Sequence, residues 1–240
     1  MTAVSPGILY AVGLGPGDPG LVTVRAAEIL RSAPVVAYPV DAGGDPGRAY
    51  QIARAYVAPG AIELPLAMPM TSHRPTLEAA WDSGVAAIAA EAAAGRDVAY
   101  LCLGDTLLYG SFGYLLARYT GQVCVIPGVI SPVAAAAALR EPLVEGREPL
   151  VIVPDGGDID LLRGALALGG TVVIMKPSRL NAEAVALLEQ TGAIARARVT
   201  QDVTLPTERI YTPGSAAELA ALPYFSIVTI LAPGRDVTQL

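Results

Sequence analysis

The chain has 240 residues, of which 53% are hydrophobic and 16% charged, and its formal net charge is −6. This composition predicts a well-packed globular protein of one large or two small domains, rather than a disordered chain. The acidic balance, without any dense cluster of Lys and Arg, argues against nucleic-acid binding.

In the first half of the chain, short apolar runs alternate with alanine-rich helical stretches, which predicts an α/β domain with mostly parallel strands. The expected strands cover residues 8–14, 34–38, 61–65, 98–103 and 122–126. The expected helices cover residues 20–32, 46–57, 75–94, 110–119 and 131–139.

In the second half, the predicted strands follow one another more closely. Five apolar runs, PLVIVP, TVVIMK, RVTQDV, ERIYT and FSIVTIL, have only two clear helices among them, at 159–168 and 181–191. This spacing favours a mixed sheet. We therefore expect two α/β domains, each with a roughly five-stranded sheet, at residues 1–143 and 144–240, with a division as early as Gly121 as the alternative.

The first strand ends in the Gly/Pro-rich loop Gly13–Asp18 (GLGPGD), and an amphipathic helix follows. The loop is not a dinucleotide fingerprint, because Asp18 stands where the third glycine is required, and no Lys-Ser/Thr pair follows as in a P-loop. An aspartate here disfavours phosphate, so a cationic, neutral or dipolar ligand fits better. The alternative is a plain strand-to-helix turn with Asp18 as the helix cap.

Three further strand ends carry elaborate turns: LGDTLLYGS at 103–111, IPGVIS at 126–131 and MKPSR at 175–179. In open α/β sheets, ligands bind at the carboxyl ends of the strands. Each loop taken singly is also typical of a plain turn, and Met175 is typical of a core residue. Together with the first loop, they indicate a ligand site.

Metal and hydrolase chemistry find no support in the sequence. The single histidine, His73, and two separated cysteines give no metal-ligand spacing, and no G-x-S-x-G elbow accompanies His73. Cys102 and Cys124 lie in apolar runs, which predicts reduced, buried strand residues and favours the cytoplasm. With no secretory signal and no apolar run of transmembrane length, we expect a soluble protein without a membrane partner.

Four segments in order along the chain resemble the four signatures of the tetrapyrrole (corrin and porphyrin) methyltransferases, which use S-adenosylmethionine. They are VGLGPGDPGLVTVRAAEIL, LGDTLLYGSFGYLL, IPGVISPVAAAAALREPL and VVIMKPSRL. YPV at 38–40, MPMTSHRPTLEAAWDSGVAAIA at 68–89 and the closing PYFSIVTIL look most like the C20-methylating branch of that family. The resemblance implies an active site in a trough between two α/β domains, and a homodimer.

The resemblance also places the S-adenosylmethionine contacts in the four loops. They fall at Pro16, Leu103, Gly104, Asp105, Leu108, Ile130, Ser131 and Met175. The chain departs from the family's commonest pattern at Thr106, where proline is usual, and at Ile130, where threonine or serine is common. Both residues keep a backbone N–H and C=O. The residues themselves agree with a sulfonium ligand, because these loops are rich in carbonyls and aspartates.

The implied substrate is a reduced tetrapyrrole, precorrin-2 or cobalt-factor II, whose carboxylate arms need cationic partners. Arg74, Lys176 and Arg179 are the favoured candidates, with Arg48 a weaker one, and Asp18 is a further expected substrate contact. Each cation is also typical of a solvated surface.

The implied reaction moves a methyl group from sulfonium to the meso carbon C20, mainly through in-line placement of the two reactants. Asp105 and Tyr109 are candidate general bases for the C20 proton, with water as an alternative. Methylation at another position, such as C2/C7 of uroporphyrinogen III or C11/C17 of a later precorrin, is the rival within the family. A binding module without activity is the rival outside it.

Overall fold

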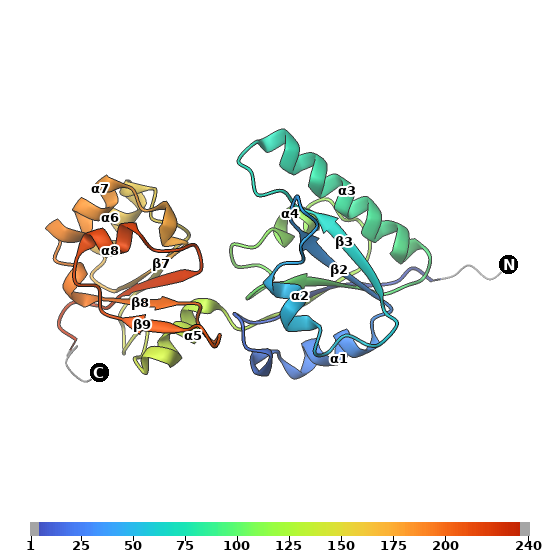
Figure 1. Cartoon of the computed structure of the whole chain (residues 1–240), viewed down its shortest axis with the longest axis horizontal. Helices are drawn as coiled ribbons and strands as arrows, with labels where there is room; N and C mark the ends of the chain where they lie inside the picture. Colours follow the sequence, from blue (N-terminus) through green and yellow to red (C-terminus); the bar gives the residue numbers. More distant parts are fainter. Residues whose placement is uncertain (1–4, 236–240) are drawn as a thin grey trace. The chain divides into compact units, whose positions relative to one another are not determined.

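The computed structural model describes residues 5–235, and the chain divides into two compact units, residues 1–130 and 131–240. Each unit is built on one five-stranded sheet with helices on both faces (Figure 1). The first unit contains β1 (Leu9–Gly13), η1 (Pro19–Leu21), α1 (Val24–Ser32), β2 (Val35–Val40), α2 (Arg48–Ala53), β3 (Ile62–Ala67), α3 (Arg74–Ala93), β4 (Val98–Cys102), α4 (Phe112–Leu116) and β5 (Val123–Ile126).

The first sheet is entirely parallel, in the order β3-β2-β4-β1-β5. Its inner strands β1, β2 and β4 are apolar and largely buried along their length, as a parallel sheet covered on two faces requires. One face packs against α1 and α2 through residues such as Leu30 and Ile52. The other packs against α3 and α4 through Trp81, Ile88 and Leu115.

The second unit is built on a mixed sheet. Its elements are α5 (Ser131–Leu139), β6 (Leu150–Val153), α6 (Ile159–Ala167), β7 (Thr171–Met175), η2 (Pro177–Arg179), α7 (Ala182–Gln190), η3 (Ile194–Arg196), β8 (Ala197–Gln201), β9 (Arg209–Tyr211), α8 (Ala216–Ala220) and β10 (Ser226–Ile230). The strand order is β6-β7-β10-β8-β9, and only β6 and β7 pair in parallel. Helices α6, α7 and α8 cover one face and α5 the other (Figure 1).

The structure confirms the α/β class, with an all-parallel first sheet and a mixed second sheet. The helix expected over 20–32 is divided, because Thr23 caps α1 by accepting the Ala26 N–H at 3.2 Å. Helix α8 has no counterpart among the expected helices. The boundary between units follows Ile130, between the expected division at 143/144 and its alternative at Gly121, and Ala135 of α5 packs against Val173 and Ile227 of the second sheet.

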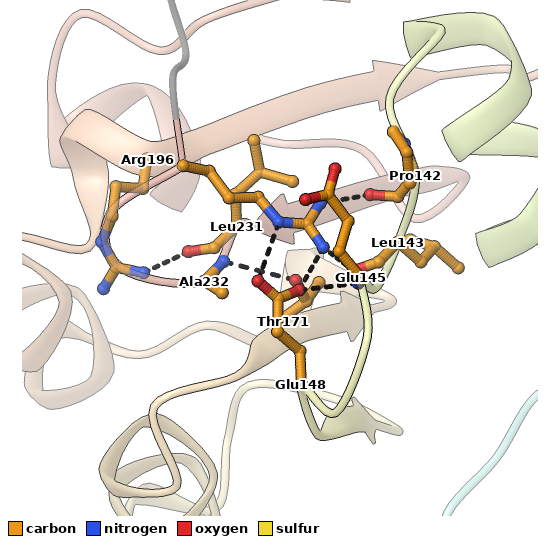
Figure 2. Close-up of polar contacts among 9 residues, drawn as sticks. Pro142, Leu143, Glu145, Glu148, Thr171, Arg196, Leu231 and Ala232 are labelled. Carbon is orange, nitrogen blue, oxygen red and sulfur yellow. Dashed lines mark hydrogen bonds and ion pairs between the residues drawn. The ribbon is translucent and has the colours of Figure 1, made fainter.

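Figure 2 shows the polar contacts between the segment that follows α5, residues 142–148, and the residues that follow β10. The Arg235 guanidinium forms an ion pair with both Glu148 oxygens and donates to the carbonyls of Pro142 and Leu143. Glu148 also accepts the Glu145 N–H at 2.9 Å. Hydrogen bonding to Arg235 is the largest effect on the Glu148 carboxyl and lowers its pKa. Arg235 therefore fixes this segment against the second sheet.

We expect Arg235→Met to lower the thermal unfolding temperature at neutral pH. The pKa of Glu148 in the folded protein lies below the usual value of a Glu carboxyl. The ion pair therefore stabilises the fold in full above that usual value, and this contribution to the free energy of unfolding disappears as pH falls through the folded-state pKa. The difference between parent and variant should thus shrink below about pH 4. Arg147→Met, at an exposed position of the same segment, is the control. An equal difference at neutral and acid pH would contradict the assignment.

Candidate functional site

Three loops meet at one edge of the first sheet, where β4, β1 and β5 end. These strands are neighbours and run parallel, so their carboxyl ends lie side by side. The loops follow directly as residues 14–18, 103–111 and 127–130. The structure thus confirms that the three motifs of the first unit stand at strand carboxyl ends, the usual place for ligands in such sheets.

Glycines bring the three loops into backbone contact. A Cβ added at Gly128 would lie 2.1 Å from the Gly104 oxygen, and one added at Gly13 would lie 2.5 Å from the Gly128 nitrogen. Gly15 and Gly104 exchange two backbone hydrogen bonds, of 3.1 and 2.8 Å. Gly15 and Gly104 also have φ of 77° and 71°, which glycine adopts without steric cost. Side chains at Gly13 or Gly128 would force the loops apart.

Asp105 joins the second loop to the third. Its Oδ1 accepts the Leu107 N–H at 2.9 Å, and its Oδ2 accepts the Gly128 N–H at 3.0 Å. Hydrogen bonds to a charged acceptor are stronger than neutral ones. The side chain therefore has a positioning role within the loops, and its role as a general base stays a prediction.

The electrostatic character of this edge is set by carbonyls and carboxylates. Residues 13–18, 103–111 and 126–130 contain Asp18 and Asp105 but no Lys or Arg. Asp18 caps η1, since its Oδ1 accepts the Gly20 N–H at 2.7 Å, as the turn interpretation of the first loop expects. A Cβ at Gly104 would meet nothing within 4 Å, so space opens beside that residue. The edge suits a cationic or dipolar small molecule better than a phosphate.

The remaining predicted residues of the first unit belong to the same three loops. Pro16 is buried, Leu103 is exposed and Leu108 is half-buried. Tyr109 is 43% exposed and has φ of 53°, a conformation that is uncommon outside glycine. Such outliers gather at functional sites. Ile130 is half-buried and ends the unit.

In the second unit, the predicted residues lie at the start of α5 and at the end of β7. Ser131 is the first residue of α5, and Met175 is the last of β7; both are half-buried. Lys176 turns the chain with φ of 50°, and its carbonyl accepts the Arg179 N–H at 3.2 Å. Arg179 is paired with Asp155 at 3.2 Å. Within residues 5–235, Lys176 forms no ion pair.

A further strand end in the second unit has features that sequence analysis missed. Strands β7 and β8 are both antiparallel to β10, so they run in the same direction and end at the same edge of the sheet. After β8, Asp202 and Thr204 have φ of 46° and 68°. The predicted strand RVTQDV runs through this turn, whereas β8 ends at Gln201. The only sequence signal is the polar QD pair at the end of the run.

Arg74 lies in an aromatic cluster between α3 and α4. Its guanidinium carbon is 5.2 Å from the Trp81 ring centre and 5.7 Å from that of Tyr114, and these two rings stack at 4.1 Å. Its Nε also pairs with Glu78 Oε1 at 2.7 Å. The Arg74 charge is thus already neutralised by a neighbour on the same helix, which weakens its case as a substrate cation.

Other reactive groups give no alternative site in the described part of the chain. No group of His, Cys, Asp and Glu residues there could hold a metal ion. Burial raises the pKa of the Cys102 thiol far above its usual value, so this cysteine is not a nucleophile. His73 is exposed, and its ring Nδ1 lies 2.7 Å from Thr76 Oγ1. No helix within residues 5–235 is long and apolar enough to cross a membrane.

Comparison with known proteins agrees with the four motifs. Residues 8–220 match the family described as Tetrapyrrole (Corrin/Porphyrin) Methylases. The chain belongs to this tetrapyrrole methylase family. The cobalt-precorrin-2 C(20)-methyltransferase of Salmonella typhimurium is 33% identical over 227 residues, 93% of this chain and 96% of that protein. The precorrin-2 C(20)-methyltransferase of a Sinorhizobium species is 33% identical over 244 residues, 98% of each protein.

Longer relatives and solved structures carry the same likeness. The cobalamin biosynthesis protein CobIJ of Mycobacterium tuberculosis is 34% identical over 93% of this chain, which spans about half (46%) of that protein. The structure of the cobalt precorrin-4 methyltransferase CbiF has a TM-score of 0.74 at 23% identity, covering 92% of this chain and 93% of that one. A uroporphyrin-III C-methyltransferase from Thermus thermophilus, complexed with S-adenosylhomocysteine, has a TM-score of 0.65 at 24% identity, with 93% and 97% covered. These tetrapyrrole methylases share the fold.

We expect Asp105→Asn to weaken binding of S-adenosylhomocysteine and to lower the unfolding temperature. The amide nitrogen of Asn cannot accept the second backbone N–H, so one donor loses its partner, at a cost of about 1–3 kcal/mol. Calorimetry without tetrapyrrole measures the affinity. Asp41→Asn is the matched control, because a single oxygen, Oδ1, accepts both the Gly43 and Asp45 N–H groups there. Unchanged affinity in Asp105→Asn would contradict the positioning role.

Proposed function

We propose that this tetrapyrrole methylase transfers a methyl group from S-adenosylmethionine to C20 of precorrin-2 in cobalamin biosynthesis. The observation that carries the proposal is the pair of C20-methyltransferases at 33% identity, which align over 93% and 98% of the chain. Their names differ in whether the substrate contains cobalt and agree on the carbon. The proposal includes the homodimer that the family resemblance implies and a cytoplasmic location.

The residues of the first unit fit S-adenosylmethionine in chemical character. The cofactor supplies an electrophilic methyl group on a cationic sulfonium. Pro16 and Leu103 would offer backbone carbonyls, and Leu103 also its N–H. Gly104, whose N–H and carbonyl pair with Gly15, would supply the open space beside them. Leu108 and Ile130 would add apolar contact, and the absence of Lys and Arg from these loops keeps the surroundings favourable to a cation. From the second unit, Ser131 and Met175 complete the proposed contacts.

The chain's own contribution to the reaction is placement. A meso carbon of a reduced tetrapyrrole is already nucleophilic through enamine-like conjugation, so no strong base is needed before transfer. Holding the two reactants in line can lower the barrier by about 7–11 kcal/mol. Asp105 holds the second and third loops together through the Leu107 and Gly128 N–H groups. After transfer, the C20 proton leaves through the Tyr109 hydroxyl or water.

The carboxylate arms of the substrate require cations, and the ion pairs of the candidates favour Lys176. Arg74 and Arg179 have acidic partners, Glu78 and Asp155, and both guanidinium side chains are more than half exposed. Lys176 follows the proposed cofactor contact Met175 and has no ion-pair partner among the described residues. In this proposal Lys176 is the main substrate cation.

A product assay tests the proposal. The purified chain is incubated with S-adenosylmethionine and, separately, with precorrin-2, cobalt-factor II or uroporphyrinogen III. The expected product gains one methyl group, and a carbon-13 label on the donated methyl reports attachment at C20. If the label were found at another carbon, the protein would methylate a different position of the tetrapyrrole, and the proposal of C20 transfer would be wrong. Cofactor binding without any transfer would favour the binding-module alternative.

We expect Lys176→Met to weaken tetrapyrrole binding by about 1.5–3 kcal/mol, the worth of a hydrogen bond to a charged group. Affinity for S-adenosylhomocysteine should stay at the parent's value. Arg179→Met is the matched control, because its charge is already paired with Asp155. Fluorescence titration with the tetrapyrrole measures the first affinity and calorimetry the second. A loss confined to cofactor affinity would instead assign Lys176 to the cofactor loop.

A further inference from the structure

The sheet face beneath α5 carries an unusual set of polar side chains. In the antiparallel pairs, Thr229 stands opposite Arg198 and Ile227 opposite Thr200. Because residues paired in this way share a face, Arg198 and Thr200 lie on the same face as Ile227, which packs against Ala135 of α5. Helix α5 contacts both β8 and β10. The polar residues are therefore covered by this helix.

These side chains are deeply buried. Arg198 is 3% exposed, and Thr200 and Thr229 are each 1% exposed. Within residues 5–235, neither threonine hydroxyl has a hydrogen-bond partner. A buried hydroxyl without a partner costs free energy, and a buried charge costs more. An apolar set of similar size would pack here without that cost, so stability alone does not account for the layer.

The chain following α5 brings an acid to this layer. Arg140 has φ of 59°, the left-handed conformation in which helices commonly end. The Glu141 N–H donates to Ala136 O at 3.1 Å and the Arg140 N–H to Ala137 O at 3.2 Å, which is the Schellman pattern. Glycine usually occupies this position, and an arginine there is strained. The turn directs Glu141 back to the sheet.

Glu141 and Arg198 then join the end of α5 to β8. Glu141 Oε1 lies 3.6 Å from Arg198 Nε, and the side chains are 18% and 3% exposed. Arg198 Nη1 also donates to the Ala197 carbonyl at 3.0 Å. Two of the four buried residues of α5 are alanines, whose small side chains offer little interlocking with neighbours; the four are Pro132, Ala134, Ala135 and Leu139. The ion pair adds a specific contact at the end of the helix.

We propose that Arg198 and Glu141 are positioning residues that fix α5, and through it Ser131 at the start of the helix. This inference rests on the proposed function, in which Ser131 contacts S-adenosylmethionine. A rigid helix anchored at one end carries that constraint to its other end. Buried ion pairs contribute little to stability compared with apolar residues of similar volume, whereas in some proteins they select one arrangement of the elements.

The double variant Arg198→Met/Glu141→Leu tests the proposal without leaving an unpaired buried charge. We expect it to unfold within a few degrees of the parent's temperature, or above it. Its dissociation constant for S-adenosylhomocysteine should rise about tenfold, and the backbone amides of α5 should exchange hydrogen faster. The single variant Arg198→Lys, which keeps the charge, should bind S-adenosylhomocysteine more tightly than the double variant and less tightly than the parent.

The matched control is Arg196→Met, which removes a guanidinium two residues away that donates to the Leu231 carbonyl instead. Its affinity should equal the parent's. Parental affinity in the double variant would overturn the inference, as would weaker binding with unchanged exchange of the α5 amides. If the parent protein bound no S-adenosylhomocysteine, the proposed function would be overturned instead. Comparing amide hydrogen exchange in α5 between parent and double variant would still show whether the ion pair anchors the helix.

Discussion

The candidate site depends on a junction made of backbone alone. Gly13 and Gly128 lie so close to neighbouring backbone atoms, the Gly104 carbonyl among them, that a Cβ added at either would collide, and Asp105 fixes the contact through two backbone N–H groups. The loops continue from three adjacent strands of the parallel sheet. They are therefore held as one body before any ligand arrives, and preorganisation of this kind lowers the entropy lost on binding.

The turns at the strand ends of the second unit are built differently from the glycine junction of the first. Its sheet is mixed, so fewer strands end at the edge that carries Met175, and the turns there use left-handed residues other than glycine, at Lys176, Asp202 and Thr204. Each such residue costs conformational free energy, which the surrounding packing must offset. Each of these turns keeps a side chain. This edge of the second sheet therefore carries charged and hydroxyl groups at its turns, which glycine turns cannot supply.

Much of the fold follows from sequence periodicity, because apolar alternation and turn residues are local signals. The parallel and mixed sheets, the 20-residue helix α3 and the strand-end loops were all predictable in this way. The partners of Asp105 were not, since Gly128 lies 23 residues away and only the folded sheet brings it near. The same holds for α5: its alanines predict a helix but do not indicate which sheet it covers.

Cations and carboxylates are distributed unevenly among the loops proposed to bind the two ligands. The glycine junction has aspartates and no cations, whereas Lys176 lies at the end of β7, after Met175. A sulfonium would be repelled by a nearby ammonium, and a carboxylate arm by an aspartate, each by an amount that grows as water is excluded. In the proposed function, the loops of the glycine junction therefore suit the sulfonium, and Lys176 suits a carboxylate arm. Arg198, which is equally cationic, is withdrawn from solvent by burial beneath α5 and by its pairing with Glu141.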